Sequence, residues 1–430
     1  MSVNKTILIK GGRVIDPENN LDDCQDILVK DGKISKISRD IKCEADKVIE
    51  AKGKIILPGL VDMHVHLREP GREDKETVNS GTRAALKGGI TTLLAMPNTT
   101  PAMDSEENIE LLQKIIKNTA LNNVLVCAAI TRGRKGEELT EVAKFKKHAV
   151  VAISDDGASI DNQDLMFKAL VKAREQKMLL ISHCEDKSLS NNGVVNLGLT
   201  STRLGLRGIA RESEYKRVER DVRLAEKARA RLHIAHVSCR ESVEIISEAK
   251  KRKVKVTCET APHYFSLSQE DLSGYDTNLK MNPPLRGRED VRAIKQGLKD
   301  GTIDVIASDH APHTPNEKEI EFDRAEFGVI GLETELAASV SALVHTGIID
   351  WSGLARKMCL NPARILGIDR GTLGVGAIAD IVIIAPDQEW TVRKEGLVSL
   401  SRNSAFLGKA LMGFVELTIY SGKIMYSILP

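Results

Sequence analysis

Aromatic residues are scarce in this sequence, and neither sign of charge is in large excess. Phe, Trp and Tyr make up 3% of the 430 residues, and 62 Lys and Arg stand against 60 Asp and Glu, a formal net charge of +2. Proteins that bind single-stranded nucleic acids stack bases on aromatic side chains, and nucleic-acid-binding domains usually carry a basic patch or stripe. The two absences together argue against a nucleic-acid partner.

Long apolar runs and regularly spaced cysteines are also lacking. No stretch approaches the roughly 18 consecutive apolar residues of a membrane span, and the apolar run within residues 1–10 is too short for a secretion signal. The seven cysteines are odd in number and scattered, a pattern that predicts reduced thiols. We therefore expect a cytoplasmic protein without a membrane partner.

The two ends of the chain share a β-rich texture. Short apolar and polar runs alternate between turn residues over residues 1–57, and the same texture returns after residue 371. This pattern is typical of short β-strands joined by tight turns, and over residues 1–57 it predicts a small antiparallel module. We expect residues 1–57 and 367–430 to build one composite β-sandwich domain.

Between these ends, short apolar runs alternate with helical stretches, which indicates βα units around a parallel sheet. The alternation predicts a (β/α)8 TIM-like barrel over residues 58–366, an α/β fold whose catalytic groups lie at the carboxyl ends of the strands. The eight expected strands are residues 60–66, 91–96, 124–130, 149–154, 178–183, 232–237, 254–259 and 303–309.

The first expected strand carries two histidines two positions apart, His64 and His66. Alternate residues point to the same face of a strand, so the two imidazoles could share a metal ion such as zinc. Arg68 follows on the same parity, which would direct its side chain to the same face. Taken alone, the pair is equally compatible with two histidines hydrogen-bonded to backbone in a core strand.

Polar side chains also end or follow most of the other expected strands. Because the carboxyl ends of barrel strands converge on one mouth, these side chains should lie close together. Nitrogen and oxygen donors suit zinc or another divalent first-row metal, and an aspartate between two ions would make the site binuclear. Asp309 could touch the metal and move a proton between water and a leaving nitrogen. The residues concerned are Asn98, Asp155, Asp156, His183, Glu185, His236, Asp309 and His313.

Several motifs in this order resemble those of the dihydroorotases, a family of the cyclic amidohydrolase superfamily. The resemblance spans nearly the whole chain. The motifs are DMHVHLREPG at residues 62–71, AMPNT at 95–99, SDDG at 154–157, NPPLR at 282–286, SDHAPH at 308–313 and SRNSAF at 401–406.

The resemblance implies an enzyme that reversibly closes N-carbamoyl-L-aspartate to L-dihydroorotate in de novo pyrimidine (UMP) synthesis. It implies a zinc cofactor with two ions per subunit. It also implies a homo-oligomer and, in some members, an association with aspartate carbamoyltransferase. Of the two adjacent aspartates after the fourth strand, it favours Asp156 over Asp155 as the bridging group. The implied metal ligands are His64, His66, Asp156, His183, His236 and Asp309, with Asp309 also catalytic. The implied substrate contacts are His66, Arg68, Asn98, Asn282, His313, Phe327 and Gly328.

Two alternatives remain at this point. Hydantoinases and allantoinases share the superfamily, but they usually bridge their metals with a carboxylated lysine, where this chain has Asp156. Arg68 also argues against them, because it is placed to pair with the extra carboxylate of dihydroorotate. A non-catalytic partner of aspartate carbamoyltransferase would have lost metal histidines, and this chain keeps all four.

Overall fold

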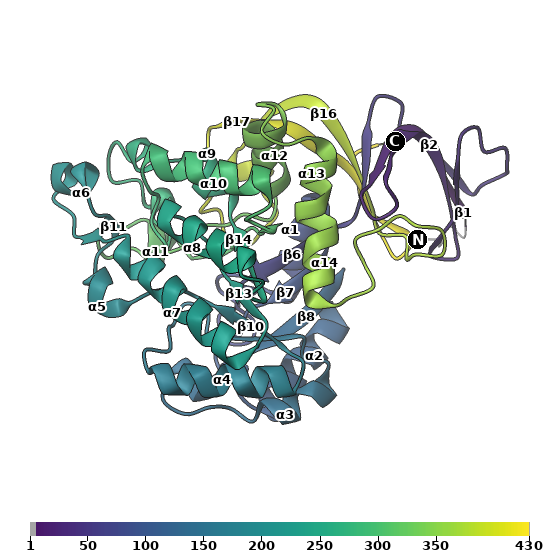
Figure 1. Ribbon diagram of the computed structural model, residues 1–430. Helices are drawn as coiled ribbons and strands as arrows, with labels where there is room; N and C mark the ends of the chain where they lie inside the picture. The colour runs from purple at the N-terminus through teal and green to yellow at the C-terminus, as the bar shows by residue number, and fades with distance from the viewer. Residues whose placement is uncertain (1–5, 430) are drawn as a thin grey trace.

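Eight short parallel strands form the centre of the molecule in the computed structural model, which describes residues 6–429 (Figure 1). Their order in the sheet follows the chain from β6 to β15, and a parallel bridge between Val65 and His310 brings the last strand back to the first. The predicted barrel is confirmed. The strands are β6 (Leu60–Val65), β7 (Ile90–Ala95), β8 (Asn123–Ala128), β9 (Ala152–Ser154), β10 (Leu179–Ser182), β13 (Leu232–Ile234), β14 (Val256–Thr260) and β15 (Val305–Ile306).

Most of these strands end earlier than the apolar runs that predicted them. Strand β15 covers only Val305–Ile306, although the apolar run reaches Asp309, and pairing resumes only as an isolated bridge at His310. Beyond the paired residues the backbone turns toward the barrel mouth, and Asp309 itself has a positive φ of 49°. An apolar run indicates which residues are buried, and residues remain buried beyond the last one whose backbone pairs with a neighbouring strand.

Helices follow the strands and cover the outside of the barrel (Figure 1). In α4, for example, Met166, Ala169, Leu170 and Ala173 are buried at helical spacing, and the Asn162 side chain caps the first turn. The longer helices are α1 (Val78–Lys87), α2 (Glu106–Thr119), α4 (Gln163–Glu175), α7 (Glu212–Ala228), α8 (Arg240–Lys251) and α10 (Arg288–Asp300).

Shorter helices lie in the connections and after β15. After β15, α12 continues into a π-type turn, and α13 continues through a second π-type turn into α14. The short helices are α3 (Val142–Phe145), α5 (Lys187–Ser190), α6 (Leu199–Leu204), α9 (Pro262–Ser266), α11 (Pro315–Lys318), α12 (Glu335–Ser339), α13 (Trp351–Ala355) and α14 (Asn361–Leu366). A two-stranded ribbon, β11 (Val195–Asn196) with β12 (Gly208–Ile209), completes the connections.

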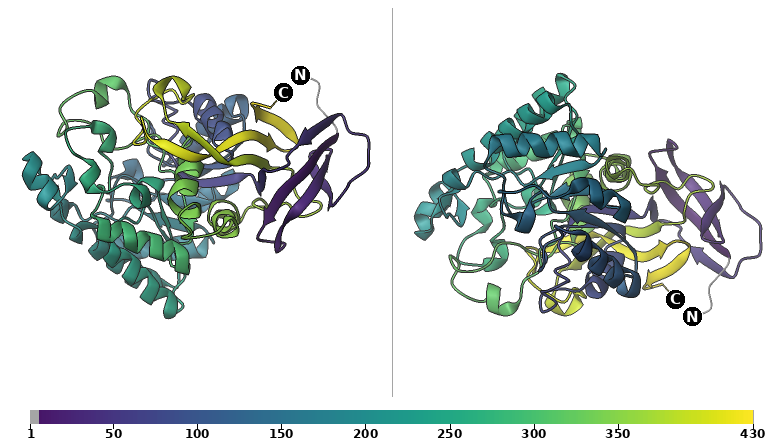
Figure 2. Two further views of the ribbon diagram at one scale, coloured as in Figure 1. Left: turned by 90° about the horizontal axis from the view of Figure 1, so that it is seen from above. Right: turned by 90° about the horizontal axis from the view of Figure 1, so that it is seen from below.

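The two chain ends meet in a second sheet beside the barrel. Strand β5 pairs antiparallel with β16, with Pro58 opposite Ile381, and buried residues from both ends, such as Ile9 and Leu417, pack into one core. Figure 2 shows the last strands (yellow) running beside the barrel to the first ones (purple). The strands are β1 (Thr6–Asp16), β2 (Leu21–Lys30), β3 (Lys33–Ser38), β4 (Lys47–Glu50), β5 (Ile55–Pro58), β16 (Ile381–Thr391), β17 (Ala410–Tyr420) and β18 (Lys423–Ser427).

The predicted β-sandwich from both chain ends is therefore present, but its N-terminal part is not purely antiparallel. Strand β1 pairs in parallel with β4 and β5. This is possible because β2 and β3 intervene in the chain and act as the crossover that parallel neighbours need. The residue boundaries of the domains, 57/58 and 366/367, stay a prediction, and residues 1–5 and 430 lie outside the described part of the chain.

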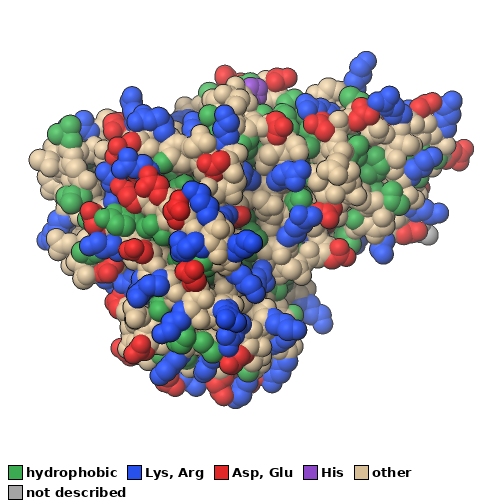
Figure 3. Space-filling view, viewed as in Figure 1, with side chains coloured by type: hydrophobic (Ala, Val, Ile, Leu, Met, Phe, Trp, Pro, Cys, Tyr) green, Lys and Arg blue, Asp and Glu red, His purple; other side chains and the backbone are tan. Residues whose placement is uncertain are grey.

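Within residues 6–429, no helix has both the length and the apolar character needed to span a membrane. On the face shown in Figure 3, acidic and basic side chains are interspersed rather than gathered by sign. This distribution agrees with the near-equal numbers of the two kinds of charge in the sequence.

Candidate metal centre and active site

The carboxyl ends of five barrel strands bring four imidazoles and two carboxylates together. Each of these side chains is buried, and each lies at or just beyond the last paired residue of its strand. All six were predicted from the sequence as metal ligands. They are His64 near the end of β6, His66 just after it, Asp156 after β9, His183 after β10, His236 after β13 and Asp309 after β15.

Asp156 lies between two pairs of histidines. Its Oδ1 atom is 3.3 Å from His64 Nε2, and its Oδ2 atom is 3.5 Å from His66 Nε2. On the other side, Oδ1 is 3.7 Å from both His183 Nδ1 and His236 Nε2, and these two nitrogens are 2.7 Å apart. Two groups of three donors therefore share Asp156, and within each group the ligand atoms lie within 4.8 Å of one another.

These donors fit a metal cofactor by their hydrogen bonding as well as by their chemistry. His64 Nε2 and Asp156 Oδ1 are buried and have no hydrogen-bond partner among the described residues. Leaving a buried polar atom unsatisfied costs about 1–3 kcal/mol. A cation among these nitrogen and oxygen atoms would satisfy both, and imidazole and carboxylate are the donors that zinc and its neighbours accept.

The two carboxylates of the cluster are held in their charged form. Burial acts to raise the pKa of Asp156, but His64 and His236 outweigh it and leave that pKa well below its ordinary value. Burial likewise acts to raise the pKa of Asp309, and His66 and His64 leave it lowered. Both aspartates are therefore anionic near neutral pH, as metal binding requires.

Asp155 faces away from the cluster. Its Oδ1 atom accepts hydrogen bonds from the backbone N–H groups of Ile130 and Thr131 at 2.8 and 3.0 Å, and the Thr131 hydroxyl donates to Oδ2. The carboxylate is thus occupied in tying β9 to the end of β8. Of the two adjacent aspartates, only Asp156 is among the grouped donors.

Three residues of the site have a left-handed backbone. The φ angles of Arg68, His236 and Asp309 are 63°, 34° and 49°, a region that costs a non-glycine residue about 1–3 kcal/mol. These turns direct the side chains to the mouth. Strand parity does not set the direction of Arg68, because β6 ends at Val65 and a left-handed turn follows. The side chain nevertheless lines the same cavity as His66, as predicted.

A cavity of about 280 Å³ opens over the cluster. All seven predicted substrate contacts line it, together with Asp156, His183, His236 and Asp309, whereas His64 lies deeper and is fully buried. The sequence analysis missed Arg134, which also lines the cavity and donates to the backbone carbonyl of Asp156. The seven contacts are His66, Arg68, Asn98, Asn282, His313, Phe327 and Gly328.

Comparison with known proteins agrees with this arrangement. Residues 53–242 match the family model described as Dihydro-orotase-like. The curated protein named Dihydroorotase from Elusimicrobium minutum is 51% identical over 417 residues, 97% of this chain and 96% of that protein. The one from Geotalea daltonii is 50% identical over 421 residues, 98% of this chain and 99% of that protein. The chain belongs to the dihydroorotase family.

Solved structures share the fold at lower identity. L-Hydantoinase (dihydropyrimidinase) from Arthrobacter aurescens has a TM-score of 0.89 at 25% identity and covers 98% of this chain and 96% of its own. A D-hydantoinase has a TM-score of 0.87 at 24% identity and covers 98% of this chain and 95% of its own. The barrel and its flanking sheet are thus common to several amidohydrolases, and the side chains of the cavity must distinguish this family from them.

Arg68 is a half-buried cation, and no carboxylate pairs with it among the described residues. Its Nε donates to the Pro312 carbonyl at 3.1 Å and its NH2 group lies 3.3 Å from His313 Nε2. Among the described residues, no carboxylate oxygen lies within 4.0 Å of it. Nearby Glu69 and Glu73 accept from the backbone instead. Burial lowers the Arg68 pKa to about 10, so the guanidinium is still charged at neutral pH.

Glu259 is a positioning residue that the sequence analysis missed. It is the next-to-last residue of strand β14, and its Oε1 atom accepts from His64 Nδ1 at 2.5 Å while His233 Nε2 lies 3.2 Å from Oε2. A carboxylate on Nδ1 fixes the tautomer that leaves Nε2 free for a metal. A glutamate at the end of an apolar strand was the available signal, but its histidine partner lies 195 residues away.

We expect Glu259→Gln to weaken metal binding by about 10- to 100-fold, the usual effect of changing a carboxylate behind a ligating histidine. Metal titration of the metal-free protein measures the change, and excess metal should restore activity. Glu248→Gln, on the exposed face of α8, is the matched control. Unaltered metal affinity in Glu259→Gln would contradict the orienting role.

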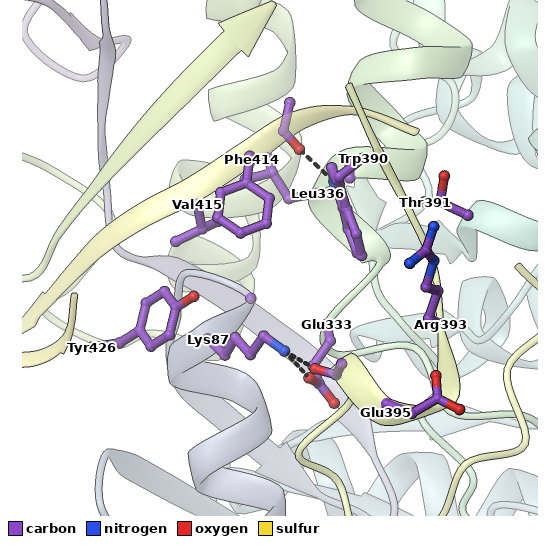
Figure 4. A pocket seen from close by; sticks show the side chains of 14 residues that line it. Lys87, Glu333, Leu336, Trp390, Thr391, Arg393, Glu395, Phe414, Val415 and Tyr426 are labelled. Atoms are coloured by element: carbon purple, nitrogen blue, oxygen red, sulfur yellow. Dashed lines mark hydrogen bonds and ion pairs between the residues drawn. The ribbon is translucent and has the colours of Figure 1, made fainter. Parts of the chain in front are cut away.

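A larger cavity, of about 430 Å³, lies apart from this site between α1, α12 and strands β16 to β18 (Figure 4). Aromatic side chains, Trp390, Phe414 and Tyr426, form much of its lining, and none of the predicted site residues is part of it. On one wall Lys87 Nζ pairs with Glu333 at 3.1 Å. The predicted substrate contacts line the smaller cavity at the barrel mouth instead.

Proposed function

We propose that this chain is a dihydroorotase, which interconverts N-carbamoyl-L-aspartate and L-dihydroorotate by closing and opening a cyclic amide, a step of pyrimidine synthesis. Arg68 carries the proposal, because its half-buried guanidinium has no carboxylate partner among the described residues and shares the cavity with the histidine–aspartate cluster. Dihydroorotate has a free carboxylate, which hydantoin and dihydrouracil lack. A guanidinium binds a carboxylate through paired, charge-assisted hydrogen bonds.

For the cofactor we propose two zinc ions per subunit, with Asp156 shared between them. The shared position of Asp156 in both donor groups supports this number. When bound, the metal polarises the amide carbonyl and makes water a nucleophile near neutral pH. The proposed ligands are His64, His66, Asp156, His183, His236 and Asp309.

Asp309 is the proposed proton carrier. Its Oδ1 atom lies 3.3 Å from His66 Nε2, and its side chain borders the cavity. In ring opening, Asp309 accepts a proton from the attacking water and passes it to the ring nitrogen that leaves. In ring closure Asp309 takes that proton from the attacking nitrogen and returns it to the hydroxide that leaves as water. Its lowered pKa keeps it ready as a base at neutral pH.

The remaining lining residues hold the substrate. We assign the carboxylate to Arg68 with Asn98 and His313, and the ring to Asn282 and the backbone of Phe327–Gly328, with His66 at the reacting end. Burial and the neighbouring cations, Arg68 first, lower the pKa of His313 to about 2, so this imidazole stays neutral and serves as a hydrogen-bonding group. The His66–Asn98 hydrogen bond of 2.8 Å keeps the amide of Asn98 beside the cluster.

We also propose that the chain forms a homo-oligomer in the cytoplasm and that it associates with aspartate carbamoyltransferase. These proposals rest on the family resemblance and on the unpaired cysteines. Light scattering after size-exclusion chromatography, with and without the carbamoyltransferase from the same source, tests both kinds of assembly.

One assay tests the activity. The purified protein is offered dihydroorotate, hydantoin, dihydrouracil and allantoin, and bound metal is measured on the same sample. We expect turnover of dihydroorotate with two zinc ions per chain. Turnover of hydantoin or allantoin in preference to dihydroorotate would favour the hydantoinase-type alternative. No turnover of any of the four by metal-loaded protein would favour the non-catalytic partner.

The two adjacent aspartates provide an internal comparison. Asp156→Ala should lower the metal stoichiometry, because it removes the carboxylate shared by both donor groups. Asp155→Ala should keep the metal but lower the melting temperature, because the amides of Ile130 and Thr131 lose their acceptor. Elemental analysis and thermal denaturation of both variants measure the difference. Greater metal loss in Asp155→Ala would transfer the bridging role to that residue.

A further inference from the structure

Two lysines are buried beside the catalytic cavity without a carboxylate partner. Lys280 is 2% exposed and Lys318 is 3% exposed, and no carboxylate oxygen of the described residues lies within 4.0 Å of either ammonium group. Burial lowers the pKa of Lys318 to about 7 and of Lys280 to about 8. Lysine is almost never fully buried unless it is paired, so the fold retains these two groups at a cost.

Both ammonium groups bind the backbone of the segment that forms one wall of the cavity. Lys318 Nζ donates to the carbonyls of Glu326 at 2.8 Å and Gly328 at 3.0 Å, and more weakly to that of Lys280 at 3.4 Å. Its three N–H donors are thereby matched by three acceptors. These contacts enclose Phe327, the residue between two of the bound carbonyls.

Lys280 completes the arrangement from the other side. Its Nζ donates to the carbonyls of Phe322 at 2.8 Å and Asp323 at 3.1 Å, and lies 4.6 Å from the centre of the Phe327 ring. A cation over an aromatic face at this range is attracted by the ring. The Lys280 backbone carbonyl also accepts from Gly328 N–H at 3.0 Å.

The two lysines therefore tie together two loops that approach the cavity from different parts of the chain. Lys280 lies two residues before Asn282, and Lys318 binds the carbonyl of Gly328. The Phe327 carbonyl in turn lies 2.9 Å from His313 Nε2. Displacing either lysine would release the backbone on which three of the cavity's lining residues depend.

We propose that Lys280 and Lys318 are positioning residues for the substrate, a clamp that sets the distance between Asn282 and the Phe327–Gly328 wall. The proposal rests on the proposed function in one respect, because it assumes that these three residues hold the ring. Each ammonium group binds two or three backbone carbonyls at defined distances. Hydrogen bonds of this kind fix the position of the wall more closely than apolar packing would. Neither lysine belongs to the donor cluster.

The test uses Lys280→Met and Lys318→Met in the full-length, metal-loaded protein, with Lys299→Met as the control for loss of one exposed charge on α10. A displaced binding group can reduce the rate up to about 100-fold. We expect KM for dihydroorotate to rise about 10-fold in each clamp variant, with a smaller change in kcat and an unchanged metal content. Hydrogen exchange of residues 320–328 should be faster than in the unaltered protein without any substrate present.

The outcomes separate the clamp from a merely structural role and from the proposed function. Unchanged KM and unchanged exchange in a folded, metal-loaded Lys318→Met variant would overturn the proposal. A variant that loses metal, with a fall in kcat as large as the rise in KM, would also overturn it. If the methionine variants do not fold, Lys318→Gln, which keeps two N–H donors, is measured by the same criteria. If the unaltered protein fails to open dihydroorotate, the proposed function fails, while the exchange rates still decide whether the lysines hold the wall.

Discussion

Replacing His183 or His236 with alanine should remove most of the bound metal and lower kcat/KM for dihydroorotate by at least about 100-fold. Losing a residue that only supports a metal ligand costs about 10- to 100-fold, and losing the ligand itself should cost at least as much. The two imidazole nitrogens lie 2.7 Å apart and each is 3.7 Å from Asp156. Each variant leaves one donor group with only two of its three members. Elemental analysis and steady-state kinetics on the same preparations measure both effects.

His345→Ala is the matched control for these variants. His345 is exposed, and its Nε2 lies 3.1 Å from the Pro386 carbonyl. It should keep the metal and full activity. If His183→Ala and His236→Ala also keep both, the cluster at the strand ends is not the metal site.

Replacing Arg68 with methionine should leave the metal in place but lower kcat/KM for dihydroorotate by about 100-fold. A hydrogen bond to a charged group contributes about 1.5–3 kcal/mol, which corresponds to about 10- to 150-fold in binding. Misplacement of the reacting amide adds to this loss. Trace turnover of dihydrouracil, which has no carboxylate for the guanidinium to bind, should change little. Kinetics with both substrates and metal analysis provide the measurements.

Arg83→Met, on the exposed side of α1, is the control for loss of an arginine close in sequence. The competing explanation is that Arg68 only supports its loop through the Pro312 carbonyl. In that case the melting temperature or metal content of Arg68→Met would fall, and both substrates would suffer alike. That result would remove the main argument for dihydroorotate over an uncharged cyclic amide.

The barrel architecture, and which polar residues stand at the ends of its strands, could be predicted from the amino-acid sequence alone. Eight apolar runs separated by helical stretches allow few folds other than a (β/α)8 barrel, because a buried parallel strand must be apolar on both faces. A histidine or aspartate at the end of such a run is therefore conspicuous, as His183, His236 and Asp309 are. The barrel topology then requires these residues to meet at one mouth, and in the structure all three line one cavity there.

Directions and partners were decided only by the tertiary structure. Local periodicity could not direct Arg68, because its left-handed backbone is set by the loop around it. Nor could it pair Glu259 with His64, since these residues are 195 positions apart in the chain. It could not bring Lys280 to the carbonyl of Phe322 or Lys318 to that of Lys280 either, since these contacts span 42 and 38 positions. The parallel pairing of β1 with β5 likewise could not be predicted from local periodicity. A sequence pattern records whether a residue is buried, whereas the atom that it meets there depends on how distant segments pack together.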